Sequence, residues 1–160
     1  MKICVVPGSF DPFTSGHLDI VRRAAGLFDK VYVAIMVNGG KQGNFTFDVR
    51  RRIAEVSCEG LENVEVISSD GLLYELCESL GACAIVKGLR NAIDYSYECE
   101  LAEINRHLSP VLETVLLAAR PELGYISSSY VRELVRYGKP LGDVLHPAAV
   151  KLLSGLSAQT

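Results

Sequence analysis

PGSFDPFTSGH, residues 7–17, lies between a strand-like run at residues 2–6 and a helix-like run at residues 17–28. A strand, a glycine-containing loop and a helix in this order are typical of an open parallel sheet. In such sheets, ligands bind at the carboxyl ends of the strands, where the positive end of a helix dipole favours an anion. We therefore expect residues 7–17 to form an anion site.

The glycines and the histidine of this stretch favour phosphate as the anion. Gly8 lets the backbone come close to a ligand, and Gly16 leaves open space beside His17. Thr14 or Ser15 can cap the helix, which places His17 in its first turn. A histidine there can donate a proton to the negative charge that develops on a phosphate. The alternative is a glycine-rich surface turn with a solvated histidine.

Length and composition favour one cytoplasmic domain that covers residues 1–160. No segment is long and apolar enough to span a bilayer, so no membrane partner is expected. The chain enters a strand directly after Met1, without the regions of a signal peptide, which indicates a cytoplasmic protein. The net charge of −3 argues against general nucleic-acid binding. The five cysteines form no CxxC pair, so zinc and redox motifs are unsupported.

Strand-like and helix-like segments alternate along the chain. The expected strands are residues 3–6, 31–37, 64–67, 84–87 and 114–118. The expected helices are residues 17–28, 47–58, 72–80, 95–108 and 130–137, with a short one after Pro147. The strands are rich in valine, isoleucine and leucine, as strands buried on both faces require. The pattern predicts a single-domain α/β fold, a Rossmann-like parallel five-stranded sheet with helices on both faces.

Local signals add detail to the helices. Thr46 and Asp70 can cap the second and third helices. The fourth helix carries an apolar stripe of Tyr97, Leu101, Ile104 and Leu108. If this stripe faces the core, Glu98 lies about 100° further round and can point to the sheet edge.

Three further segments are expected at the same sheet edge as residues 7–17. The loop with Lys41 follows the second strand, Lys87-Gly88-Leu89-Arg90 follows the fourth, and Ile126-Ser127-Ser128-Ser129 precedes the fifth helix. The lysines and the arginine bring positive charge, and the serines offer hydroxyl and backbone N–H donors at a helix start. Each segment alone also fits a solvated loop or a cap. Their convergence is what indicates a phosphate site.

Other chemistries lack their motifs. The nucleophile elbow G-x-S-x-G, the Walker A lysine motif, the dinucleotide glycine spacing and metal-ligand spacing are absent, so no metal-ligating residue is expected. What remains is a site with a histidine, cations and helix ends, without a covalent intermediate. Direct attack of one phosphate on another needs only alignment and neutralisation of charge.

Thr14-Ser15-Gly16-His17 resembles the T/HxGH signature of a nucleotidyltransferase superfamily. KGLRNAIDYSYE (residues 87–98), NRHLSP (105–110) and YISSSYVRE (125–133) resemble the bacterial phosphopantetheine adenylyltransferases, and the similarity covers nearly the whole chain. The resemblance implies transfer of AMP from ATP to 4′-phosphopantetheine, which gives dephospho-coenzyme A and pyrophosphate in the penultimate step of coenzyme A synthesis. It also implies Mg²⁺ as cofactor and a homohexamer.

The resemblance implies roles for individual residues as well. His17 would stabilise the pentavalent transition state at the α-phosphate, and Lys41 would bind and orient the phosphate of the second substrate. ATP would be bound by Ser9, Phe10, His17, Gly88, Arg90, Glu98, Tyr125, Ile126, Ser127, Ser128, Ser129, Tyr130 and Val131. Phosphopantetheine would be bound by Ser9, Lys41, Leu72, Leu73 and Lys87.

Lys87 is a departure, because many members of that family have arginine there. Lysine keeps the charge and loses the bidentate guanidinium. Two alternatives stay open: a related nucleotidyltransferase with another phosphate acceptor, such as nicotinamide mononucleotide or glycerol 3-phosphate, and a nucleotide-binding regulator without catalysis. The intact motif at residues 14–17 argues against the regulator.

Overall fold

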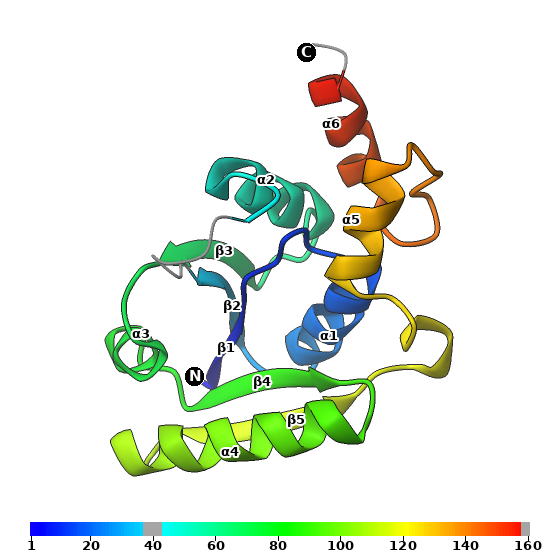
Figure 1. Cartoon of the computed structure of the whole chain (residues 1–160). Helices are drawn as coiled ribbons and strands as arrows, with labels where there is room; N and C mark the ends of the chain where they lie inside the picture. The colour runs from blue at the N-terminus through cyan, green and yellow to red at the C-terminus, as the bar shows by residue number, and fades with distance from the viewer. Residues whose placement is uncertain (37–42, 158–160) are drawn as a thin grey trace.

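A five-stranded parallel sheet forms the centre of the computed structural model, which describes residues 1–36 and 43–157 (Figure 1). The strands are β1 (Ile3–Gly8), β2 (Lys30–Met36), β3 (Val64–Ser69), β4 (Ala84–Leu89) and β5 (Glu113–Ala118). Their order is β3-β2-β1-β4-β5, and each neighbouring pair is parallel. The chain order therefore reverses between β1 and β4, which is where open α/β sheets bind their ligands.

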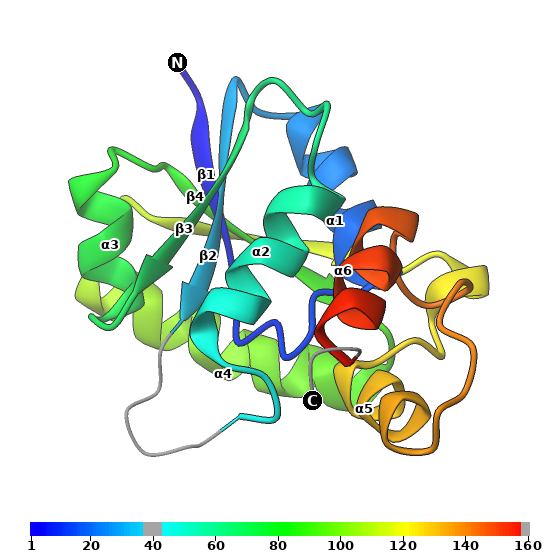
Figure 2. The same cartoon turned by 90° about the horizontal axis from the view of Figure 1, so that it is seen from above.

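Helices cover both faces of this sheet. They are α1 (Ser15–Ala25), α2 (Phe47–Ser57), α3 (Leu73–Ser79), α4 (Ala92–Leu108), α5 (Ser128–Arg136) and α6 (Pro147–Ser157), with a 3₁₀ turn, η1 (Pro121–Leu123), before α5. Two perpendicular views place α1, α2 and α6 on one face and α3 and α4 on the other (Figures 1 and 2). Helix α6 packs against α2. None of the described helices has the length and apolar character needed to cross a membrane.

Strand β1 lies at the centre of the core. Its residues Cys4 and Val6 join an apolar cluster with side chains of α1, α2 and α6. Val5, which points to the other face, joins a second cluster with Cys77 of α3 and Leu112. The continuous apolar run of β1 is explained by this burial on both faces.

The predicted five-stranded parallel sheet with helices on both faces is confirmed. The differences lie at the ends of elements. Strands β1, β3 and β4 run on to Gly8, Ser69 and Leu89, because pairing with their neighbours continues past the apolar runs. The predicted end of the second strand, Val37, lies outside the described residues.

Of the two expected caps, Thr46 is confirmed and Asp70 was wrong. Leu72 occupies the N-cap of α3 without a side-chain hydrogen bond. The condition that the α4 stripe faces the core is not met, since Tyr97 is 60% exposed and Ile104 is 54% exposed. Helix α4 packs on β4 and β5 at the edge of the sheet, which leaves much of its apolar surface in solvent.

Candidate active site

The carboxyl ends of β1 and β4 open into a cavity of about 500 Å³. Its walls come from the loop after β1, the end of β4 with the start of α4, and the segment that enters α5. The predicted site residues that line it are Ser9, Phe10, His17, Lys87, Gly88, Arg90, Glu98, Ile126, Ser127, Ser128 and Ser129. Three of the four segments expected at this edge therefore meet around one cavity. The fourth carries Lys41, which lies outside the described residues.

The ring of His17 is held by the N-cap of α1. Thr14 accepts a hydrogen bond from the His17 backbone N–H at its Oγ1, 3.3 Å away. The backbone N–H of Thr14 donates in turn to Nδ1 of the His17 ring at 3.0 Å. Because Nδ1 is an acceptor, the proton of the neutral ring lies on Nε2. One N–H donor is thus left for a ligand.

His17 is neutral at physiological pH. Burial is the main cause that lowers its pKa from 6.5 to about 4, and the positive charges of Arg90 and Lys87 lower it further. The sequence predicted proton donation to an anion. In the structure His17 is a neutral hydrogen-bond donor, so it can donate a hydrogen bond to a phosphate without carrying a positive charge.

Two phenylalanine rings fix the plane of the His17 ring. Phe10 meets it edge-on with 5.0 Å between ring centroids, and Phe13 is tilted against it at 5.5 Å. A Cβ atom on Gly8 would lie 2.8 Å from Cζ of Phe10. Gly8 is therefore required for the close approach of the Phe10 ring, a reason that the sequence did not reveal.

Two cations of the cavity are paired with carboxylates of α4. Nζ of Lys87 lies 3.0 Å from Oε1 of Glu98, and Nε of Arg90 lies 3.0 Å from Oδ2 of Asp94. The carboxylates are four residues apart and so share one helix face. A phosphate that binds either cation has to compete with a carboxylate that is already in place.

Arg132 and Asp94 line the cavity as well, and the sequence reasoning missed both. Arg132 donates from one guanidinium nitrogen to the Asp11 carbonyl at 2.8 Å and from the other to Oγ of Ser129 at 2.9 Å. It follows Ser129 by three positions, so helical spacing from the serine run could have identified it. Asp94 could have been found by its spacing from Glu98 in the same way.

Known proteins are similar to this chain in sequence over most of its length. The model of the cytidylyltransferase-like family matches residues 5–134. A phosphopantetheine adenylyltransferase of Streptococcus pneumoniae (strain CGSP14) is 49% identical over 141 residues, which cover 88% of this chain and 87% of the relative. Another, from Caldanaerobacter subterraneus subsp. tengcongensis, is 42% identical over 143 residues, 89% of each chain. The chain belongs to the phosphopantetheine adenylyltransferase family.

A solved structure outside this close group has the same fold. It is a Vibrio parahaemolyticus protein provisionally assigned as a nicotinate-nucleotide adenylyltransferase, with a TM-score of 0.75 and coverage of 97% of this chain and 93% of that chain. At 18% sequence identity the likeness concerns the fold alone.

Five residues suggested by likeness to the phosphopantetheine adenylyltransferases lie outside the cavity wall. Leu72 and Leu73 lie at the start of α3, with Leu72 59% exposed. Val131 is fully buried in the core and presents no side chain to the cavity. Tyr125 and Tyr130 pack in a T-shaped contact with centroids 6.2 Å apart, and Tyr130 lines a second cavity, of about 650 Å³, between α5 and residues 44–45. Ligand contacts of these five residues stay predictions.

Proposed function

We propose that this protein transfers AMP from ATP to 4′-phosphopantetheine and releases pyrophosphate and dephospho-coenzyme A. The observation that carries the proposal is the neutral ring of His17, with its Nε2–H free, in a cavity that also contains Lys87 and Arg90. The choice of acceptor is supported by the relatives of 42–49% identity that bear the name phosphopantetheine adenylyltransferase.

The reaction is a direct displacement. An oxygen of the phosphopantetheine phosphate attacks the α-phosphorus of ATP, and the bond from that phosphorus to the pyrophosphate oxygen breaks as the new bond forms. His17 donates a hydrogen bond from Nε2 to an α-phosphate oxygen, where negative charge grows in the pentavalent transition state. No residue forms a covalent intermediate, so the protein supplies alignment and charge neutralisation.

The two substrates occupy different parts of the cavity in this proposal. ATP lies toward Arg90, Glu98 and the start of α5, where Ser127 is the N-cap and the positive end of the helix dipole favours phosphate. Phosphopantetheine lies toward Lys87 and Ser9, and its phosphate takes the place of the Glu98 carboxylate beside Lys87. The released Glu98 carboxylate is then free to accept hydrogen bonds from a ribose.

Magnesium enters this proposal as part of the ATP complex. Within residues 1–36 and 43–157, no group of three or more His, Cys, Asp or Glu side chains could hold a metal ion. The cavity carboxylates of Asp94 and Glu98 are paired with cations, so this donor set does not fit a resident ion. Mg²⁺ commonly binds substrate phosphates and waters with few protein ligands.

A cytoplasmic homohexamer completes the proposal. Association between copies is supported by apolar side chains on α4, because Ile93 and Tyr97 are 81% and 60% exposed and lie four residues apart on one helix face. Light scattering on the purified protein should give about six times the chain mass of 17.4 kDa. A monomer at micromolar concentration contradicts the assembly and leaves the enzymatic proposal intact.

Pyrophosphate release tests the activity. The purified protein with ATP, Mg²⁺ and 4′-phosphopantetheine should release pyrophosphate, and parallel reactions with nicotinamide mononucleotide or glycerol 3-phosphate should not. If pyrophosphate is released only with one of the other acceptors, that acceptor is the substrate and the proposed substrate is wrong. Tight ATP binding without release, under all three conditions, makes it a regulator.

A further inference from the structure

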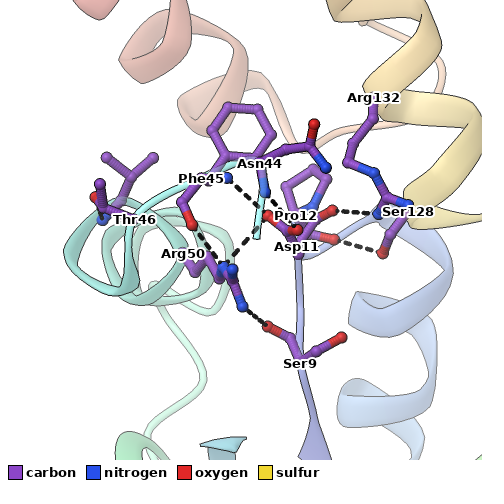
Figure 3. Close-up of polar contacts among 10 residues, drawn as sticks. Ser9, Asp11, Pro12, Asn44, Phe45, Thr46, Arg50, Ser128 and Arg132 are labelled. Carbon is purple, nitrogen blue, oxygen red and sulfur yellow. Dashed lines mark hydrogen bonds and ion pairs between the residues drawn. The ribbon is translucent and has the colours of Figure 1, made fainter. Parts of the chain in front are cut away.

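A buried ion pair joins the loop after β1 to helix α2 (Figure 3). Arg50 and Asp11 are 5% and 7% exposed, and Nε of Arg50 lies 3.2 Å from Oδ1 of Asp11. Neither is among the described residues that line the cavity. A buried pair of charges stabilises a fold only when hydrogen bonds satisfy its remaining donors and acceptors. The partners of this pair are therefore informative.

The pair forms hydrogen bonds with the backbone of two segments, residues 44–45 and Ser9. The carboxylate of Asp11 accepts hydrogen bonds from the backbone N–H groups of Asn44 and Phe45, each at 2.9 Å. Arg50 donates from Nε to the Phe45 carbonyl at 2.8 Å and from a terminal nitrogen to the Ser9 carbonyl at 3.3 Å. The loop after β1 and the segment before α2 are thus held as one unit.

Helix α5 holds the same loop from the opposite side. Arg132 donates to the Asp11 carbonyl at 2.8 Å, and Oγ of Ser128 donates to the Pro12 carbonyl at 2.8 Å. Figure 3 shows these contacts on one side of the loop and the Arg50 contacts on the other. The loop is therefore fixed between two helices that are far apart in sequence.

Phe10 lies between the fixed residues Ser9 and Asp11 and has a strained backbone. Its φ of 43° falls in the left-handed region, which bulky residues seldom adopt. Such a conformation persists only where the surrounding contacts over-determine it. The strained turn places the Phe10 ring edge-on against His17, with centroids 5.0 Å apart.

We propose that Arg50 and Asp11 are positioning residues for the adenylyl transfer. They hold Phe10 in the conformation that packs its ring on His17, and so fix the direction of the Nε2–H. This inference rests on the proposed function for its kinetic consequence. Its structural consequence, the fixed state of the His17 ring, can be measured without any substrate.

The kinetic test uses three variants and a control from the same helix. Glutamine in Arg50→Gln cannot bridge the Phe45 and Ser9 carbonyls, so kcat should fall on the order of 100-fold while the KM values change little. Arg50→Lys keeps one charged donor and should recover part of that loss. The double variant Asp11→Asn with Arg50→Gln removes both buried charges. It leaves no unpaired buried charge, so it should stay folded even where a single variant unfolds. The control Arg51→Gln removes only a surface contact with Glu55 and should keep the kcat of the unmodified protein.

A spectroscopic test follows His17 itself in the full-length protein with ¹⁵N-labelled histidine. The unmodified chain should show one neutral tautomer with the proton on Nε2, and the folded double variant should show mixed tautomers or broadened ring signals. A folded double variant with unchanged kcat overturns the proposal. So does a lower kcat with unchanged His17 signals. If the unmodified protein releases no pyrophosphate, the proposed function fails, and the ring signals still decide the positioning role.

Discussion

Nδ1 of His17 accepts a hydrogen bond from the backbone N–H of Thr14 at 3.0 Å. This contact decides which ring nitrogen can face a substrate, because a neutral imidazole has one donor and one acceptor. The cap of α1 thus does two things: it satisfies helix N–H groups, and it sets the tautomer of the residue that we place at the reacting phosphate.

His17→Ala should lower kcat by about 100- to 1000-fold, with a much smaller rise in the KM values. The reason is that the Nε2–H meets charge that is larger in the transition state than in bound ATP. Steady-state pyrophosphate release measures both constants. His107→Ala, which changes an exposed histidine of α4, is the control and should behave like the unmodified protein. If substrate binding and kcat fall by equal factors, His17 contributes to substrate binding and not specifically to the transition state.

Acidification should destabilise the protein through His17. Its pKa of about 4 in the folded chain lies below the 6.5 of a free histidine. Between these values the unfolded chain binds a proton that the folded chain does not, so the free energy of unfolding falls as pH drops through this window. The loss from His17 is up to about 3 kcal/mol near pH 4. Urea unfolding at pH 7 and pH 4.5 should show a smaller loss in His17→Gln, and equal losses would contradict the assignment.

Lys87→Ala should weaken phosphopantetheine more than ATP. Loss of a charge-assisted hydrogen bond corresponds to about a 10- to 100-fold rise in KM for the substrate whose phosphate it binds. Lys87→Arg is the matched control, since it keeps the charge and presents two parallel N–H donors that can bind phosphate bidentately. Similar rises in KM for both substrates would place Lys87 at a position that the substrates share.

Gly43→Ala should cost about 1–3 kcal/mol of folding stability. A Cβ atom there would overlap the Arg50 guanidinium and lie 2.8 Å from Oδ2 of Asp11. Arg50 is buried and bound to two carbonyls, so it cannot move aside without loss. Gly142→Ala is the control because a Cβ at that glycine meets nothing within 4 Å. Thermal unfolding of the two variants tests this, and equal midpoints would count against the clash.

The sequence was sufficient for the sheet and for most of the cavity wall. Apolar runs such as residues 3–6 carry their own signal, because a strand buried on both faces has no polar positions. The strand ends were less predictable, since Gly8 and Leu89 are strand residues only because a neighbouring strand pairs with them. The stripe of α4 has core-like spacing, but spacing alone does not reveal whether the same chain covers it.

Two ion pairs between distant parts of the chain could not be predicted from the sequence for a related reason. Lys87 and Glu98 meet because the end of β4 passes the first turns of α4, and no periodicity encodes that distance. Arg50 and Asp11 are further apart in the chain and meet only when α2 packs beside the loop after β1. Both pairs depend on how elements are placed in space, which local patterns do not specify.

The pairing of Lys87 with Glu98 and of Arg90 with Asp94 has a kinetic consequence. Apart from Arg132, the described cations of the cavity are matched by carboxylates of α4, so the cavity projects only a small field into solvent and attracts anionic substrates weakly from a distance. Association rates should then depend little on ionic strength. Discrimination between phosphates then takes place after encounter, when phosphopantetheine displaces Glu98 from Lys87 and ATP displaces Asp94 from Arg90.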